Sequence, residues 1–115
     1  MAATVQPLQA ATRDQYQILH NAISQAREAC TDDSRRDDLR QMAEEIQAVL
    51  TSLNEGELQS RTADFQALGN KVKAINSELQ TLKAEINKIV DDVAIATQVT
   101  DAINGALSAS IKLFA

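Results

Sequence analysis

Apolar residues recur every three or four positions through the second half of the chain, and this repeat limits the possible folds more than any other feature. When the repeat is written as heptads, every a and d position is apolar except Thr100 and Ser110. It continues for about six heptads, more than the three or four that identify a coiled-coil pattern. The repeat predicts one long amphipathic helix at about residues 58–112. The a positions are Leu58, Phe65, Val72, Leu79, Ile86, Val93, Thr100 and Leu107, and the d positions are Leu68, Ile75, Leu82, Ile89, Ala96, Ile103 and Ser110.

Two shorter helices are predicted before the long one, at about residues 7–30 and 35–53. Pro7 suits the first turn of a helix, where its missing N–H costs nothing. The charged run 31–38 separates the two helices, and Ser34 is the predicted N-cap of the second. Gly56 is the natural C-cap that ends it. The apolar stripe of the first helix is Leu8, Ala11, Gln15, Leu19, Ala22, Ala26 and Ala29, widened by Ile18 and Ile23, and that of the second is Leu39, Met42, Ile46, Val49 and Leu53.

Turn-forming residues are scarce, which argues against a β-sheet protein. The chain has one Pro, three Gly and 3% aromatic residues, whereas an all-β domain needs turn residues about every 8–12 positions. With 115 residues the chain is long enough for one domain. We therefore predict an all-α fold, with one helical domain over residues 1–115 and a flexible N-terminus at residues 1–6.

The long stripe changes character near Val90. Before this point polar residues flank the a and d positions, and Glu78 and Lys83 occupy the g and e positions that can bridge neighbouring helices. After it the flanking positions become apolar, and Asp101 and Lys112 are the only charged residues from position 93 to the end. Residues 90–115 thus form a low-charge segment with a broad apolar face that another surface must cover.

Helix length gives two architectures for this segment. A continuous helix over 58–112 would be about 82 Å long, whereas the first helix would span about 36 Å. The favoured interpretation is an antiparallel bundle or coiled coil in which the long helix stays straight, because the heptad phase is unbroken. The alternative is a compact four-helix bundle with a break near 90–92, where Asp91 or Asp92 would cap a fourth helix.

Charge and targeting signals restrict the partners and the location. The formal net charge is −5, and Arg35 and Arg36 lie among aspartates, so no basic patch predicts nucleic-acid binding. Cys30 is the only cysteine, which excludes an intramolecular disulfide. Neither a signal peptide nor a transmembrane stretch is recognisable. The predicted location is the cytoplasm, although export by a specialised route would leave no mark in the sequence.

Catalytic and metal-binding patterns are missing from the sequence. It contains no Gly-rich phosphate loop, no paired-cysteine pattern and no HExxH. On one helix His20 and Cys30 would be about 15 Å apart, too far for a hydrogen bond; we expect a surface or boundary histidine and an apolar filler. Glu44 and Glu45 are interpreted as solvated. We predict no enzyme, no catalytic, cofactor or metal site, and no small-molecule substrate.

The function predicted from these patterns is non-catalytic protein binding through helix–helix packing of the heptad stripe. An adaptor, assembly subunit, chaperone, or toxin or enzyme inhibitor would all fit. The predicted partner is another protein, further copies of the chain, or both. The predicted interface lies on the broad face after Val90, and the competing interpretation is that this face is internal core. The interface residues are Val93, Ala96, Val99, Ile103, Leu107 and Ile111.

Two alternative functions use the same stripe differently. A membrane-active protein, such as a pore-forming component, would insert the C-terminal amphipathic segment. Against this, interfacial helices usually carry several Lys or Arg on the polar face, and only Lys112 is present there. A structural coiled coil would instead use the stripe to join copies of the chain into an oligomer.

Overall fold

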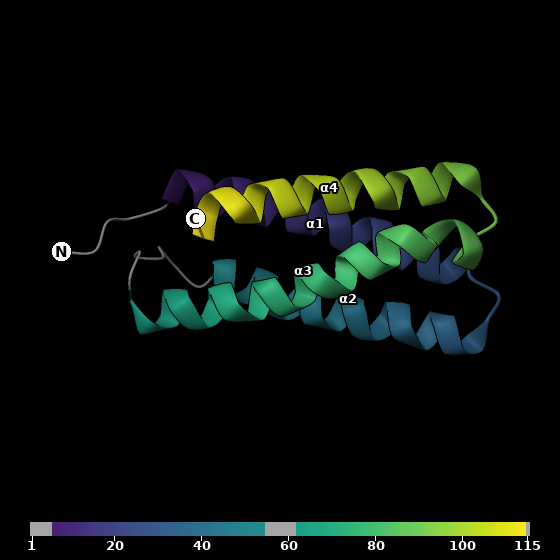
Figure 1. Ribbon diagram of the computed structural model, residues 1–115, viewed down its shortest axis with the longest axis horizontal. Helices are drawn as coiled ribbons and strands as arrows, with labels where there is room; N and C mark the ends of the chain where they lie inside the picture. The colour runs from purple at the N-terminus through teal and green to yellow at the C-terminus, as the bar shows by residue number, and fades with distance from the viewer. Residues whose placement is uncertain (1–5, 55–61, 115) are drawn as a thin grey trace.

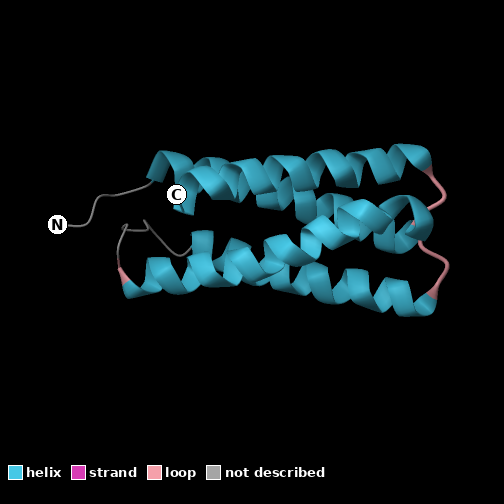
Figure 2. Cartoon of the chain, viewed as in Figure 1, coloured by secondary structure: helices cyan, strands magenta, loops and turns pink. Residues whose placement is uncertain are grey.

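The computed structural model describes residues 6–54 and 62–114, and within them the chain forms four helices and no strand (Figure 2). They are α1 (Gln6–Ala29), α2 (Asp33–Asn54), α3 (Ala63–Ile89) and α4 (Val93–Phe114). The all-α prediction is confirmed, and the first two predicted helices match α1 and α2 to within two residues. Of the predicted flexible N-terminus, residues 1–5 lie outside the described residues and Gln6 begins α1, while Gly56 and Leu58 also lie outside them.

The four helices run antiparallel to their chain neighbours and form a bundle of 50 × 21 × 20 Å (Figure 1). Each helix contacts two others: α1 packs on α2 and α4, and α3 packs on α2 and α4. The bundle is therefore two helical hairpins, α1–α2 and α3–α4, placed side by side. The hairpins meet along two sides, one formed by α1 and α4 and the other by α2 and α3.

The continuous third helix that we favoured is wrong, and the compact four-helix alternative is confirmed. Helix α3 ends at Ile89, and α4 begins at Val93 and runs back along the bundle. Val90 has extended backbone angles, φ −122° and ψ 122°, and its side chain is buried. Asp92 then caps α4, because its Oδ1 accepts hydrogen bonds from the backbone N–H groups of Ala94 (2.9 Å) and Ile95 (3.3 Å).

The heptad pattern did not reveal this break, because apolar residues keep the same spacing on both sides of the connection 90–92. Ile86 on α3 and Val93 on α4 are seven positions apart, as two a positions of one continuous helix would be. On α3 the predicted a and d residues do face the core. On α4 the d residues remain buried, but the a residues no longer face the core, as the exposed Val93 shows. Their place is taken by the residues at the g positions. The buried α4 residues are Ala96, Val99, Ala102, Ile103, Ala106, Ser110 and Leu113.

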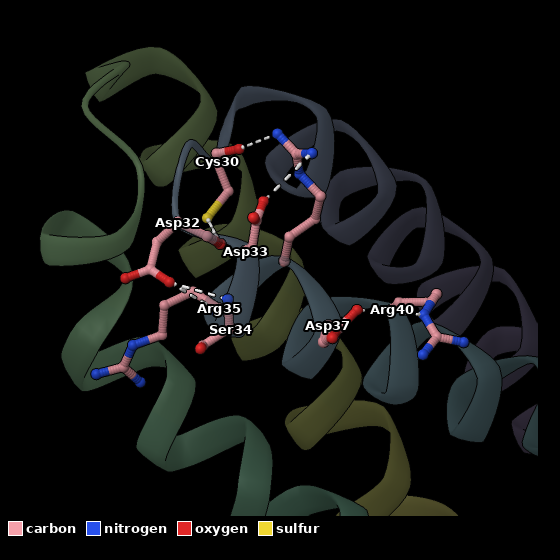
Figure 3. A network of polar contacts seen from close by, with 8 residues as sticks. Cys30, Asp32, Asp33, Ser34, Arg35, Asp37 and Arg40 are labelled. Atoms are coloured by element: carbon pink, nitrogen blue, oxygen red, sulfur yellow. Dashed lines mark hydrogen bonds and ion pairs between the residues drawn. The ribbon is translucent and has the colours of Figure 1, made fainter.

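The two hairpins turn in the same way, at the same end of the bundle (Figure 1). In each, a three-residue connection begins with a buried apolar residue, Cys30 or Val90, and ends with a capping aspartate. Asp32 Oδ1 accepts hydrogen bonds from the backbone N–H groups of Ser34 (2.9 Å) and Arg35 (3.4 Å), as Figure 3 shows. Asp32, not the predicted Ser34, is therefore the cap of α2.

The buried face of α1 is partly rotated from the predicted apolar stripe, although Leu19, Ala22, Ile23 and Ala26 are buried as predicted. Leu8 and Ile18 were expected inside but are 39% and 52% exposed, whereas Gln9, Thr12 and Tyr16 are buried. These three tolerate burial because their polar atoms find partners. The Gln9 side-chain amide donates to the Leu53 carbonyl oxygen (2.7 Å), and Thr12 Oγ1 donates to the Leu8 carbonyl oxygen (2.7 Å).

A chain of side-chain hydrogen bonds joins three helices inside the bundle. The Tyr16 hydroxyl on α1 donates to Asn76 Oδ1 on α3 (2.7 Å), and Asn76 Nδ2 donates to Ser110 Oγ on α4 (2.9 Å). Ser110 in turn donates to the Leu107 carbonyl oxygen (3.0 Å). Burial raises the pKa of Tyr16, so its hydroxyl keeps the proton that it donates. The network fixes α3 and α4 relative to α1.

The C-terminal end of α4 is held on α3 by aromatic packing. The rings of Phe65 and Phe114 have centroids 5.0 Å apart, within the range of favourable aromatic pairs. Gly69 makes room for this contact, because a Cβ there would lie 3.1 Å from the Phe114 ring. The last turn of α4 is thus packed against the chain itself.

Candidate functional site

The predicted interface on α4 divides into a buried middle and two exposed ends. Ala96, Val99 and Ile103 are buried in the bundle core, and Leu107 is half-buried. Val93 and Ile111 are 73% and 67% exposed. Four of the six predicted residues therefore pack within the chain. In this fold the broad apolar face is largely internal core, the competing interpretation of the same pattern.

Helices α1 and α4 form the most extensive contact in the bundle. Their closeness follows from small residues. At Gly105 an added Cβ would collide with the side-chain amide oxygen of Gln15, so this side chain of α1 occupies the space that the glycine leaves on α4. Thr12 Oγ1 also approaches the Ala109 carbonyl oxygen at 3.3 Å. Around Thr12, Gln15 and Gly105 the two helices therefore pack closely.

Helices α2 and α3 form the least extensive contact, and a groove of about 300 Å³ lies between them. It occupies the end of the bundle where the connections 30–32 and 90–92 lie. Apolar and charged side chains from both helices line it. The apolar residues are Leu39, Met42, Leu82 and Ile89, the charged residues are Arg35, Asp38, Glu45, Glu78 and Glu85, and Gln41 and Thr81 complete the lining.

The four carboxylates of the groove follow a regular spacing. Asp38 and Glu45 on α2 are seven residues apart, as are Glu78 and Glu85 on α3. Residues seven apart lie on the same helix face and are separated by about 10.5 Å. Because α2 and α3 are antiparallel, Glu45 lies beside Glu78, while Glu85 lies near the start of α2. The carboxylates thus form two acidic levels, one at each end of the groove.

At the inner level, Glu45 and Glu78 form a hydrogen-bonded pair of acids. The hydrogen bond to Glu78, together with burial, raises the pKa of Glu45 from 4.5 to about 7, and nearby Lys71 opposes this. Two adjacent carboxylates cannot both ionise without repulsion, so the pair retains a proton near neutrality. Glu45 Oε2 is buried with no donor among the described residues, and a proton on the pair supplies one.

Glu45 corrects one sequence interpretation, and Glu78 and Lys83 give detail to another. Glu45 was interpreted as solvated, but it lies between α2 and α3 because Glu78 provides a partner there. Glu78 and Lys83 were predicted to bridge neighbouring helices, and they do so in opposite directions. Glu78 contacts α2, whereas Lys83 Nζ donates to Asn104 Oδ1 on α4 (3.1 Å).

At the outer level an ion pair crosses the groove. Arg35 Nη1 donates to Glu85 Oε2 at 3.0 Å. Figure 3 shows the Arg35 side chain on the opposite side of the first turn of α2 from Asp37 and Arg40. Arg40 pairs within α2, with Asp37 at 3.8 Å and with Glu44. Arg35 is therefore the single cation among the groove-lining residues.

A second hollow lies on the outer surface of α1 and α4, with a volume of about 390 Å³. Amide side chains dominate its lining, and the half-exposed Ile18 is its largest apolar group. Asp101 is its only charged residue. This hollow lacks the apolar floor and the ordered charges of the groove between α2 and α3. The other lining residues are Gln15, Asn21, Ala22, Gln25, Gln98 and Ala102.

The residues considered for chemistry do not assemble into a site. Cys30 is buried, and its thiol donates to the Asp32 carbonyl oxygen at 3.5 Å (Figure 3). His20 is half-buried on α1. Within residues 6–54 and 62–114, no three His, Cys, Asp or Glu side chains gather closely enough to hold a metal ion. None of the helices in this part of the chain has the length and apolarity needed to cross a membrane.

Sequence reasoning missed the groove, although two signals for it were present. Glu45 and Glu78 each lie next to an apolar stripe, and each has a second acid seven residues away. What the sequence could not supply is that these two edges face one another. No protein-family model, no curated protein and no solved structure matches the chain.

Proposed function

We propose that this chain is a non-catalytic protein-binding module that holds a helix of its partner in the groove between α2 and α3. An adaptor, an assembly subunit, a chaperone and an inhibitor could each act in this way. The observation that carries the proposal is the groove itself. It combines an apolar floor with charged edges, as protein interfaces do.

The dimensions of the groove support a helix as its occupant. Its lining runs from Arg35 to Glu45 on α2 and from Glu78 to Ile89 on α3. Each stretch corresponds to about 15 Å of helix, or about three turns. A partner helix lying between α2 and α3 would pack on them as a further member of the bundle.

This proposal moves the interface from α4 to the other side of the molecule. The middle of the predicted α4 face is already buried by the chain's own helices. A partner would have to displace that packing to reach it. The groove needs no such rearrangement, because Met42 and Ile89 are only half-buried between two helices that contact each other least.

Site-specific photocrosslinking in the producing cells tests the proposal. A photoreactive residue is placed at Thr81 in the groove, at Ile18 on the outer surface of α1, or at Ile111 on α4. We expect one defined protein adduct from Thr81, and a weak or absent adduct from Ile18. The proposal is wrong if Thr81 gives no protein adduct, whatever the other two positions give.

The same experiment separates the two alternatives. A structural oligomer would give an adduct at twice the chain mass of 12.5 kDa. A membrane-active protein would give lipid adducts at Ile111, and the purified chain would release dye from liposomes. Because α4 folds back, no long helix extends past the other helices of the bundle, and the apolar segment lies within it.

A further inference from the structure

We infer that the partner of the α2–α3 groove is a basic amphipathic helix with two Lys or Arg residues seven positions apart along the edge of its apolar face. This inference rests on the proposed function, because it names the chemistry of the helix that the groove would hold. It is carried by the charges, the spacing and the apolar floor of the groove.

The charges of the groove are unbalanced. Four carboxylates line it, and Arg35 is the only cation among the lining residues. Arg35 is already engaged by Glu85, and Asp38 has no ion-pair partner within the described part of the chain. The adjacent acids Glu45 and Glu78 share a proton, although the nearby Lys71 favours its loss. A cation from a partner would replace that proton and balance one of the two negative charges.

The spacing of the carboxylates matches a helix. The two acidic levels are about 10.5 Å apart, which is the rise of seven residues of α-helix. A cation at one position of the partner would reach Glu45 and Glu78, and a cation seven residues away would reach Asp38 and Glu85. An extended peptide rises about 3.3 Å per residue, so its side chains would match this distance only at a spacing of three, which alternates between faces.

The floor requires an apolar face between those cations. Leu39 and Leu82 form its base and are themselves buried, so the accessible apolar surface belongs to the half-buried Met42 and Ile89 beside them. Met is flexible and fills irregular gaps, so Met42 can adjust to different apolar side chains. A basic but disordered tail would satisfy the carboxylates and leave this floor uncovered. Nucleic acid would be repelled by them.

Fluorescence anisotropy with a synthetic peptide tests the inference on the full-length chain. The probe is a labelled helix of about 14 residues, or four turns, with Leu on one face and Lys at two flanking positions seven apart. One comparison peptide carries Glu in place of both Lys. Another has the same composition in an order that removes the apolar face. We expect binding of the first peptide, and at least tenfold weaker binding of the other two.

Variants of the chain locate the binding. Glu78→Lys reverses the charge at the inner level and should weaken peptide binding by at least tenfold, since like charges in an interface repel strongly. Glu28→Lys makes the same charge change at an exposed position of α1 outside the groove, and should change the affinity less than about twofold because such a charge is screened. Circular dichroism verifies that both variants fold.

A second pair of variants tests the groove by shape alone. Thr81→Trp places a large neutral side chain in the groove and should weaken binding by at least tenfold. Ala84→Trp places the same side chain at an exposed position of α3 that does not line the groove, and should leave binding unchanged. Neither replaced residue is buried, so the fold should persist in both.

Three results would overturn the inference. They are equal binding of the Glu peptide, equal binding of the reordered peptide, and equal weakening by Glu78→Lys and Glu28→Lys. If the peptide fails while photocrosslinking at Thr81 still gives a defined protein adduct, the partner chemistry is wrong but the proposed function stands. If Thr81 gives no protein adduct, the proposed function itself fails.

Discussion

The two sides along which the hairpins meet are equivalent in architecture and opposite in packing. Helices α1 and α4 make the most extensive contact of the bundle, and α2 and α3 make the least. The first side buries small residues and brings a glycine against its neighbour. The second places acids and long side chains between its helices. The small buried residues of the first side include Ala22, Ala26, Ala102 and Ala106.

This difference shows how one bundle can provide both a stable core and a binding surface. Close packing on one side supplies contacts that stabilise the fold. The other side instead has long side chains between its helices at the groove, among them Glu45, Glu78 and Met42. The side that contributes least to stability is then free to pack against a partner.

The largest expected effect on stability comes from truncating one isoleucine on each side of the bundle. Ile103→Ala empties a fully buried position of α4 and should lower the free energy of unfolding by about 2–5 kcal/mol. Ile89→Ala removes a half-buried side chain from the groove and should cost about 1 kcal/mol, because less apolar area is lost. Urea denaturation measures both values. Equal losses would break the comparison.

Larger side chains should also destabilise the α1–α4 side more than the α2–α3 side. Ala106 is fully buried, so Ala106→Leu forces the packed helices apart and should cost about 1–3 kcal/mol. Thr81→Leu adds a comparable side chain to the groove, which has space for it, and should change stability by less than about 0.5 kcal/mol. Thermal unfolding of the two variants gives the difference. A large loss for Thr81→Leu would mean that the groove is closed in solution.

The Glu45–Glu78 pair should contribute to stability at low pH and lose that contribution as the pH rises, which is the opposite of an ordinary ion-paired carboxylate. The pKa of Glu45 is about 7 in the folded chain and 4.5 ordinarily, so the folded state binds the proton more tightly. This contribution to stability is complete below pH 4.5 and is lost as the pH rises through 7. Other carboxylates contribute with the opposite sign, so comparison with a variant isolates the pair.

Glu45→Gln supplies that comparison, because its amide donates to Glu78 at any pH. The variant should be more stable than the natural chain at pH 8 by about 0.5 kcal/mol, and the difference should disappear near pH 4.5. Glu44→Gln alters an exposed carboxylate paired with Arg40 and serves as the control. Urea titrations between pH 4 and 8 measure both variants. A constant difference across this range would show that the two acids do not share a proton.

The smallest effect on stability is expected at the outer level of the groove. Arg35 and Glu85 are partly exposed, with side chains 46% and 36% accessible, and such pairs contribute about 0.2–1 kcal/mol. Arg35→Gln should therefore lower stability only slightly while making the groove more negative. Binding of the Lys peptide should strengthen, with a steeper dependence on salt. Weaker binding would show that Arg35 contacts the partner instead of competing with it.

Local patterns predicted the helices well, because each helix depends on its own periodicity. The a and d residues of α3 from Leu68 to Ile86 are all buried as expected. The turn at Val90 was offered only as an alternative, because a three-residue connection leaves the heptad spacing intact. The rotation of α1 was missed because Gln9 and Thr12 are buried through hydrogen bonds that hydrophobic periodicity does not register.

The groove could not be predicted because it depends on the placement of two helices relative to each other. The sequence contains Glu45 and Glu78 but does not say that they meet. Once α4 folds back, each helix contacts two others, and α2 and α3 become neighbours. The binding face predicted on α4 failed to stay exposed for the same reason.

Native-state amide hydrogen exchange tests the contrast between the two sides most directly. Amides of α4 that follow its buried face, such as those of Ala102, Ile103 and Ala106, should be among the slowest to exchange. Those of Met42 on α2 and Leu82 on α3 should exchange about tenfold faster or more, equivalent to about 1.4 kcal/mol, because their side of the bundle opens more readily. Slower exchange along α2 and α3 than along α4 would contradict the account, since the open side would then be the stable core.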